Sequence, residues 1–453
     1  MNRVELLSPA GTLKNMRYAF AYGADAVYAG QPRYSLRVRN NDFMAENLAK
    51  GIEEAHQLGK KFFLATNVIP HNSKIKTFLA DMAPIIALQP NALIMADPGL
   101  IMMVRETWPE MPVHLSVQAN TVNFAAVKFW QTLGVKRIIL SRELSLDEIE
   151  EIRQRCPDIE LEVFVHGALC IAYSGRCLLS GYFNHRDPNQ GTCTNACRWK
   201  YDTLPAHENA EGDFVLGSAA LSMSDISTAS CGGADRHPLA DNIYFLEEEG
   251  RKGELLPVME DENGTYIMNS KDLRAIEHVQ RLVHMGIDSL KIEGRTKSHY
   301  YVARTAQTYR LAIDDALAGR PFQSELIGVL ENLASRGYTD GFYQRHHTHE
   351  QQNYIAGYSQ CHRQQFCGEI SYYDTDNRLA VVDVKNKFSK GDTLELISPS
   401  GNLNFIVDQI FDMHGNAMQE ASGSGYRVKI PIPSNNANQG LLARYLSHIN
   451  PTS

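Results

Sequence analysis

Four cysteines lie close together in the chain: Cys170, Cys177, Cys193 and Cys197 span 28 residues, with gaps of six, fifteen and three. Thiolates are soft ligands that bind zinc or iron–sulfur clusters. Structural zinc sites commonly use paired Cys-x-x-Cys knuckles, which this spacing lacks. Irregular spacing suits a cuboidal cluster, because each thiolate can reach its own iron. The cysteines therefore predict an iron–sulfur cluster, with a zinc site or buried free thiols as the alternatives.

The elements that must position these thiols are short strand-type runs that alternate with amphipathic helical runs. Such alternation implies a parallel sheet with helical crossovers. Seven units and one later strand give the eight strands of a (β/α)8 TIM-like barrel. An open doubly wound sheet is the alternative, but no Gly-x-Gly-x-x-Gly turn follows the first strand. The predicted strands are Val4–Leu7, Ala26–Ala29, Phe62–Thr66, Leu93–Ala96, Val113–Val117, Arg137–Leu140, Leu161–Val165 and Ser289–Ile292.

The segment after the seventh predicted strand is too long for an ordinary connection and holds five of the eight cysteines. From Gly368 onward, short strands separated by Gly, Asn, Asp and Ser turns are typical of a small β-barrel. We therefore predict a barrel over 1–335 with a Cys-rich insertion at 167–263. A linker at 336–367 and an all-β module at 368–453 follow, the module serving for docking or substrate presentation.

Polar residues directly after the predicted strands form the second set of candidate functional groups, because reactive groups of (β/α) barrels lie at the carboxyl ends of strands. Ser8, Asp97 and Ser141 are interpreted mainly as helix caps. His166 and Glu293 are the candidate catalytic residues, since each follows a strongly apolar strand and precedes Gly. The full set is Ser8, Gly11, Gly30, Asn67, Asp97, Ser116, Gln118, Ser141, His166, Glu293 and Arg295.

One long segment carries a family resemblance. The run His166-Gly-Ala-Leu-Cys-Ile-Ala-Tyr-Ser-Gly-Arg-Cys-Leu-Leu-Ser180 resembles the signature of the collagenase-like peptidase family. Further matching motifs cover most of the first 300 residues. These motifs are Glu5-Leu-Leu-Ser-Pro-Ala-Gly11, Gly23-Ala-Asp-Ala-Val-Tyr-Ala-Gly30, Asn269-Ser-Lys-Asp-Leu273 and Lys291-Ile-Glu-Gly-Arg295.

The resemblance, most of all to members of the family that modify RNA, carries several functional implications. It implies a four-iron four-sulfur (4Fe-4S) cluster, a tRNA substrate engaged at its anticodon region, and prephenate as co-substrate. The implied reaction is hydroxylation of the wobble uridine to 5-hydroxyuridine. Electron-transfer and iron–sulfur assembly proteins are the further partners that such a cluster implies.

The chain departs from the family at one cluster position. Many members carry a cysteine after Lys-Asp-Leu as a cluster ligand, and here that position is Arg274. The fourth ligand must then come from elsewhere, with Cys197 as the nearest candidate and Cys231 as the alternative. The remaining cysteines are interpreted as ordinary thiols: Cys156, Cys361 and Cys367.

Cationic side chains are the candidates for binding a dicarboxylate such as prephenate. We expect Arg37, Arg39, Lys291 and Arg295 to supply this charge, since a guanidinium fork binds carboxylate bidentately. A solvated loop pair is an equally good interpretation of Arg37 and Arg39.

Two other functions compete with RNA hydroxylation. The family's historical name suggests proteolysis, but the chain has no His-Glu-x-x-His helix and no Gly-x-Ser-x-Gly elbow. A cysteine protease would need Cys170 and His166 in contact, which four residues of separation do not show. The third hypothesis is a non-catalytic RNA-binding scaffold in which the cluster is structural.

Charge and hydropathy argue against a globally basic RNA-binding protein, a secreted protein and a membrane-spanning protein. A net charge of −8 argues against RNA binding through a globally basic surface, although a local basic patch remains compatible with it. The first residues lack the apolar stretch of a secretory signal, and Pro and Asp interrupt the most apolar region, 83–104. We therefore expect a cytoplasmic protein without a membrane span.

The ligand assignment makes a direct prediction. Cys→Ser variants at 170, 177, 193 and 197 should each lose the cluster, whereas Cys231→Ser should keep it, because one short loop presents Cys193 and Cys197. Iron, sulfide and visible absorbance of anaerobically purified protein measure this. A Cys197→Ser protein with a full cluster, or a Cys231→Ser protein without one, refutes the assignment.

Overall fold

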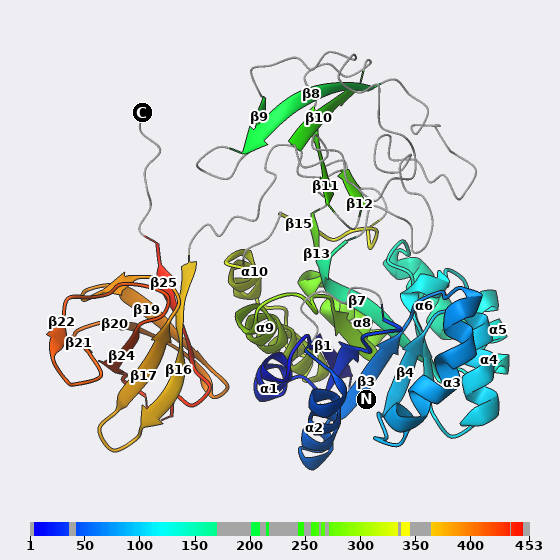
Figure 1. Cartoon of the computed structure of the whole chain (residues 1–453), viewed down its shortest axis with the longest axis horizontal. Coiled ribbons are helices and arrows are strands. Elements are labelled where there is room, and N and C mark those ends of the chain that lie inside the picture. Colours follow the sequence, from blue (N-terminus) through cyan, green and yellow to red (C-terminus); the bar gives the residue numbers. More distant parts are fainter. Residues whose placement is uncertain are drawn as a thin grey trace. The chain divides into compact units, whose positions relative to one another are not determined.

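A computed structural model of the 453-residue chain describes residues 4–35, 42–169, 201–208, 214–216, 243–248, 255–261, 264–267, 271–333, 337–344, 364–434 and 436–446. The chain divides into two compact units (Figure 1). The first unit contains 1–166, 275–333 and 361–453, and the second contains 167–274 and 334–360. The predicted β module thus belongs to the same compact unit as the predicted barrel.

The first unit contains a closed barrel of parallel strands. Each strand from β1 to β7 pairs with the next, and β14 pairs with both β7 and β1 to close the ring. The predicted (β/α)8 barrel is therefore confirmed. The barrel strands are β1 (Glu5–Pro9), β2 (Ala26–Gly30), β3 (Lys61–Thr66), β4 (Ala92–Met95), β5 (Val113–Leu115), β6 (Arg137–Ile139), β7 (Glu160–Ala168) and β14 (Ser289–Ile292).

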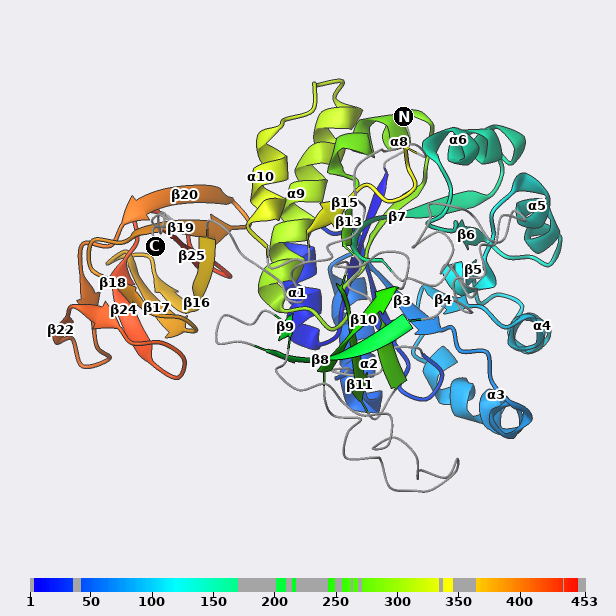
Figure 2. The same ribbon diagram turned by 90° about the horizontal axis from the view of Figure 1, so that it is seen from above.

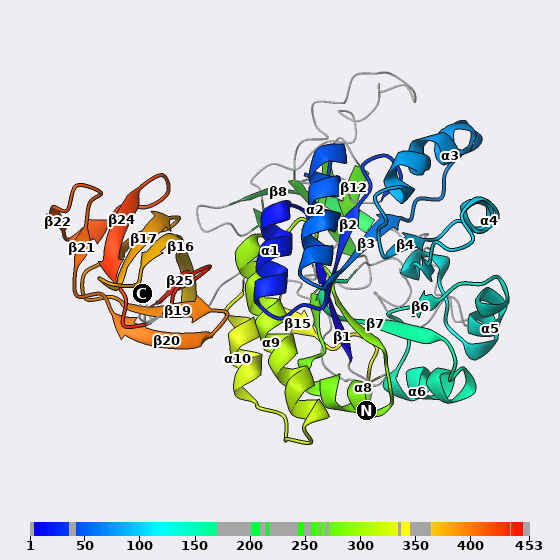
Figure 3. The same ribbon diagram turned by 90° about the horizontal axis from the view of Figure 1, so that it is seen from below.

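Helices surround the barrel strands, as Figures 2 and 3 show for α1 to α6. Side chains fix several helix starts. Thr12 caps α1, Asp97 caps α4 ahead of Pro98, and Ser145 forms a capping box with Glu148 at α6. The helices are α1 (Leu13–Ala21), α2 (Ala45–Gln57), α3 (Asn72–Ile86), α4 (Pro98–Thr107), α5 (Phe124–Thr132), α6 (Leu146–Arg155), α8 (Val279–His284), α9 (His299–Leu317) and α10 (Glu325–Glu331). None of the described helices is long and apolar enough to cross a membrane.

The second unit contains an antiparallel sheet of order β12-β11-β10-β8-β9. Sequence patterns did not predict it, and it overlaps the predicted insertion. Outside this antiparallel sheet, β13 (Asp272–Arg274) pairs in parallel with β15 (Tyr338–Thr339). The Arg274 guanidinium lies 5.2 Å from the centre of the Tyr338 ring. The sheet strands are β8 (Tyr201–Glu208), β9 (Phe214–Leu216), β10 (Ile243–Glu248), β11 (Leu255–Asp261) and β12 (Gly264–Ile267).

The carboxyl-terminal part of the first unit is an antiparallel β module with its own apolar core, which includes Ile370, Val382 and Leu396. The predicted all-β class is confirmed. The described pairings give one open sheet of order β20-β19-β25-β16-β17-β24-β21-β22 and a small sheet of β18 and β23. Its strands are β16 (Gln364–Asp374), β17 (Leu379–Val384), β18 (Phe388–Ser389), β19 (Thr393–Ser398), β20 (Gly401–Ile406), β21 (Ile410–Phe411), β22 (Ala417–Met418), β23 (Glu420–Ala421), β24 (Arg427–Pro431) and β25 (Leu441–Tyr445).

A buried ion pair joins this module to helix α9. Arg304 donates from its two terminal nitrogens to the two carboxylate oxygens of Glu395, at 3.0 and 2.9 Å. Gln364 donates to the same carboxylate at 2.7 Å. From α1's carboxyl end, the Tyr22 hydroxyl donates to the Ile397 carbonyl at 2.8 Å. Because Arg304 is only 1% exposed, its buried positive charge needs the Glu395 carboxylate of the β module as its counter-charge.

Breaking this pair should destabilise the whole first unit. Arg304→Met leaves the Glu395 carboxylate buried without its counter-charge, so we expect a loss of about 3–5 kcal/mol of unfolding free energy. Urea unfolding measures it. The matched control is Arg155→Ala, which removes an exposed pair with Glu151 and should cost no more than about 0.5 kcal/mol. Equal effects of the two substitutions would contradict the prediction.

Candidate functional site

Charged side chains form a network at the amino ends of the barrel strands. Arg137 on β6 contacts three carboxylates: Glu5 on β1 at 2.5 Å, and Glu160 and Glu162 on β7 at 2.7 and 3.0 Å. Lys61 on β3 adds a contact to Glu5 at 2.8 Å. Burial alone would raise the pKa of Glu5, but Arg137 and Lys61 together hold it below its ordinary value. Opposite charges thus compensate one another across the barrel.

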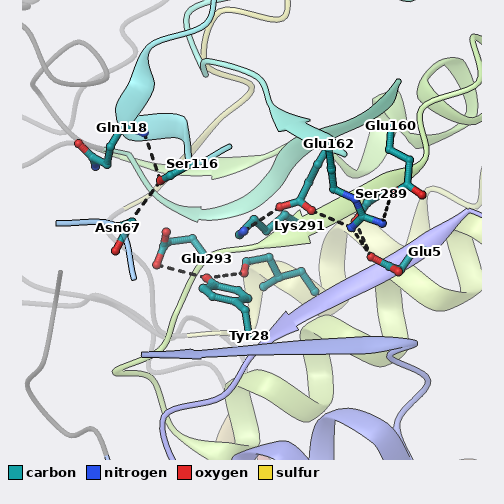
Figure 4. Close-up of polar contacts among 12 residues, drawn as sticks. Glu5, Tyr28, Asn67, Ser116, Gln118, Glu160, Glu162, Ser289, Lys291 and Glu293 are labelled. Carbon is teal, nitrogen blue, oxygen red and sulfur yellow. Dashed lines mark hydrogen bonds and ion pairs between the residues drawn. The ribbon is translucent and has the colours of Figure 1, made fainter. Parts of the chain in front are cut away.

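Lys291 continues the network toward the middle of the barrel (Figure 4). Its Nζ lies 2.7 Å from Glu162 Oε1 and 4.4 Å from the centre of the Tyr28 ring. Burial lowers the pKa of Lys291, while the Glu162 carboxylate opposes that shift. The prediction that Lys291 binds substrate is not tested by these contacts, but they engage its ammonium group in an internal ion pair.

His114 on β5 is a buried histidine beside this network. Its ring packs edge-on against Phe63, with the centroids 4.7 Å apart. Its Nδ1 has no hydrogen-bond partner within the described ranges. Burial, together with the charges of Arg137, Lys291 and Lys61, holds the pKa of His114 well below 6.5. The ring is therefore neutral at physiological pH.

Above the network, Glu293 lies at the carboxyl end of β14, at the mouth of the barrel. Its Oε2 accepts from Arg142 at 3.0 Å, and its Oε1 accepts from the Gly294 amide at 3.2 Å. The Tyr28 hydroxyl lies 3.5 Å from the same Oε1. Arg142 also lies 3.9 Å from the centre of the Phe164 ring. Both charged side chains are about one-tenth exposed, so their attraction is weakly screened.

Arg295 adds a second guanidinium at the mouth. It donates to the Ser35 hydroxyl at 2.6 Å, which links it to the segment after β2. A Cβ at Gly30 would lie 2.3 Å from the Arg295 guanidinium, so only glycine allows Arg295 to cross the end of β2. Ser35 immediately precedes the segment 36–41, which contains Arg37 and Arg39 and lies outside the described residues.

His166, the other predicted catalytic residue, contacts helix α9. Lys291 pairs with Phe164 but the next residue, Ile292, pairs with His166, so Val165 is an extra residue in β7. Such a bulge reverses the facing of the residues that follow it. The His166 ring accordingly packs against Tyr301 and Tyr309, with the Tyr309 hydroxyl 3.3 Å from Nδ1. A catalytic role for His166 stays a prediction.

The cap interpretations are partly wrong. Asp97 caps α4 as predicted, by accepting from the Leu100 amide. Ser8 caps no helix, because Thr12 caps α1. Ser141 instead donates to the Asn120 side chain at 2.9 Å, four residues before the true cap, Ser145. Ser8 and Ser141 are both buried by the barrel wall.

The predicted cluster ligands lie outside the described residues: Cys170, Cys177, Cys193, Cys197 and the alternative Cys231. Two of the predicted ordinary thiols are described, and both are free and buried. Burial raises the pKa of Cys156, and it raises the pKa of Cys367 to about 11. Both therefore favour the unreactive thiol form. In the parts of the chain that the structure describes, no group of acidic, His and Cys side chains could hold a metal.

Sequence reasoning missed Arg142 and Asn120. Arg142 follows β6 and reaches Glu293, a residue 151 positions away. Asn120 has a φ of 53°, in the left-handed region that asparagine tolerates. The signal for Arg142 was its place two residues after a predicted strand, but nothing in the local sequence identified its partner.

Family models match nearly the whole chain. The model for peptidase family U32 matches residues 11–353, and the model for the U32 carboxyl-terminal domain matches 362–444. The chain belongs to peptidase family U32. This confirms the family resemblance, and the second match coincides with the β module of the first unit.

Several curated U32 relatives cover almost all of the chain. The tRNA hydroxylation protein P of Escherichia coli (strain K12) is 60% identical over 99% of this chain and 98% of its own length. The tRNA hydroxylation protein P of Haemophilus influenzae is 56% identical over 98% and 97%. The tRNA hydroxylation protein P1 of Bacillus subtilis (strain 168) is 33% identical over 96% and 94%.

The neutral His114 should make stability depend on pH. In the unfolded chain His114 takes up a proton as the pH falls through 6.5, whereas the folded barrel keeps it neutral. The contribution of neutral His114 to the unfolding free energy is therefore fully present above pH 6.5. It is lost as the pH falls further, by up to about 1.4 kcal/mol per pH unit.

Urea unfolding of wild type and His114→Gln at a series of pH values between about 8 and 5 checks this. The unfolding free energy of the variant should fall less steeply with decreasing pH than that of the wild type. Parallel pH profiles would show that His114 takes up its proton in the folded state.

Proposed function

We propose that this chain hydroxylates the wobble uridine of tRNA to 5-hydroxyuridine, with prephenate as co-substrate. The observation that carries the proposal is the 60% identity, over 99% of the chain, to a protein named for tRNA hydroxylation. A substrate of this kind also agrees with a cytoplasmic protein. Because the net charge of the chain is −8, we expect it to bind the RNA phosphates through a local group of cationic side chains and not through a globally basic surface.

The proposed cofactor is a four-iron four-sulfur cluster on Cys170, Cys177, Cys193 and Cys197. Its support is the chemistry of the donor set, four thiols within 28 residues. When bound, such a cluster supplies one-electron transfer. Arg274, at the family's usual ligand position, has a guanidinium that cannot coordinate iron, which is why the proposal takes the fourth thiolate from Cys197.

The barrel mouth supplies the proposed proton and charge chemistry. Replacing a ring hydrogen by a hydroxyl group breaks a C–H bond, forms a C–O bond and removes two electrons, so an external oxidant must take up the electrons and an oxygen donor must supply the hydroxyl oxygen. In this proposal the Glu293 carboxylate accepts the proton of the C–H bond that breaks. Arg142 holds that carboxylate in position at 3.0 Å, and Arg295 supplies positive charge for a carboxylate of prephenate. Of the two predicted catalytic residues we favour Glu293, because the His166 ring packs against Tyr301 and Tyr309 of α9.

Proteolysis is the second candidate, because the family carries the name peptidase. The two described cysteines are buried and have raised pKa values, so neither supports a thiolate nucleophile. Incubation with casein would test the remaining possibility. Cleavage that Cys170→Ala abolishes would favour the peptidase over the proposed hydroxylase.

Substitution of Glu293 tests the proposed function. In cells lacking the native gene, Glu293→Gln should lower 5-hydroxyuridine in tRNA by about 100-fold relative to wild type, because the amide cannot accept the proton. Mass spectrometry of tRNA nucleosides measures it. Glu151→Gln on the exposed side of α6 is the matched control and should have no effect.

Wild-type protein that fails to restore 5-hydroxyuridine would overturn the proposed function itself. Full activity of Glu293→Gln would instead remove only the role assigned to Glu293. Iron content of each variant shows whether the cofactor was retained.

A further inference from the structure

Uncharged polar side chains gather at the carboxyl ends of β3, β5 and β6. Asn67 follows β3, Ser116 and Gln118 follow β5, and Ser141 follows β6. None of them carries a charge, in contrast to the interior below them. Figure 4 shows Asn67 and Gln118 at the end of the group opposite to Glu5 and Glu160.

Strand alternation directs two of these side chains to the interior. Lys61 and Phe63 on β3 face the barrel interior, since they contact Glu5 and His114, so Asn67 continues the inward-facing set. By the same period, Ser116 follows the inward-facing His114. Asn67 and Ser116 therefore belong to the mouth of the barrel and not to the helical layer.

Hydrogen bonds hold this group together. The Asn67 amide nitrogen donates to the Ser116 hydroxyl oxygen at 3.4 Å, and the Gln118 backbone amide donates to the same oxygen at 3.3 Å. Among the described residues, no hydrogen bond engages the Gln118 side chain. Ser116 is 2% exposed, whereas Asn67 and Gln118 are half-buried. The Ser116 hydroxyl is thus buried between the two residues, whose side chains remain partly exposed.

A second pair of an amide and a hydroxyl extends the group toward β6. Asn120 accepts from the buried Ser141 hydroxyl at 2.9 Å and is held at a φ of 53°. The Ser141 amide donates to the Thr121 carbonyl at 3.2 Å, which fixes the turn that carries Asn120. Left-handed backbone at a non-glycine residue is uncommon and concentrates at functional sites.

The mouth is therefore divided by chemistry. One part, from β14 and β6, carries Glu293, Arg142 and Arg295. The other part, from β3 and β5, carries Asn67 and Gln118. Charged groups bind a dicarboxylate strongly, whereas amides present both donors and acceptors without net charge.

We propose that Asn67 and Gln118 recognise the edge of the uracil ring, and this inference rests on the proposed function. A uracil edge combines two carbonyl acceptors with one N–H donor, a pattern that a side-chain amide complements and that a carboxylate or guanidinium matches only in part. The wobble base thus binds on the amide side, and prephenate binds on the arginine side. Uracil bound there lies next to Glu293, the proposed base.

Binding of an anticodon stem-loop RNA tests this assignment. The full-length protein is titrated with two RNAs, one with uridine at the wobble position and one with an abasic site there. Wild type should bind the uridine RNA about tenfold more tightly. Asn67→Ala and Gln118→Ala should each bring that ratio close to one while leaving affinity for the abasic RNA unchanged.

Two controls separate the possible outcomes. Gln57→Ala removes an exposed amide on α2 and should keep the wild-type ratio. Prephenate binding, measured by calorimetry, should be unchanged in Asn67→Ala and weakened in Arg295→Gln. An unchanged uridine preference in both amide variants overturns the inference while tRNA hydroxylation by wild type stands. Loss of hydroxylation by wild type itself overturns the proposed function instead.

Discussion

The structure depends on charge compensation inside the barrel. Three carboxylates, Glu5, Glu160 and Glu162, are matched by Arg137, Lys61 and Lys291. Glu160 and Lys61 are about half exposed, whereas Glu5, Glu162, Arg137 and Lys291 are buried. A buried charge without a partner is costly, so each of these four side chains constrains the strands that carry the others. Because the partners come from β1, β3, β6, β7 and β14, the network joins strands that are not neighbours in the sheet. It fixes the register of the barrel from within.

This compensation also defines the site above it. Lys291 pairs with Glu162 and lies 4.4 Å from the centre of the Tyr28 ring, and its role in substrate binding stays a prediction. The pair Glu293 and Arg142 lies beyond it at the carboxyl ends of the strands, where Arg295 adds a second guanidinium. Charge is compensated in the same way at Arg304, whose buried guanidinium pairs with Glu395 of the β module. The β module therefore stabilises the first unit, although a family model of its own matches it.

One extra residue decides which polar groups meet. The bulge at Val165 places Phe164 inside, against Lys291 and Arg142, and directs His166 to the tyrosines of α9. Without it, simple alternation would point His166 into the barrel beside Glu293. The Glu293 amide donates to the His166 carbonyl at 2.8 Å, but the bulge places the two side chains on opposite faces of the barrel wall.

The sequence by itself predicted the alternating α/β class, the eight strands and the β module, because hydrophobic periods of 2 and 3.6 residues are local properties. Closure of the sheet into a barrel, which the sequence favoured over an open sheet, was decided by the pairing of β14 with both β1 and β7. The sequence also determined the family and identified Glu293 as a residue at the barrel mouth. Only the tertiary structure decided the partners of the charged residues, such as Arg142 with Glu293 and Arg304 with Glu395. It alone decided the facing of His166 as well. Partner choice depends on register and closure, and those join residues more than a hundred positions apart that no local pattern relates.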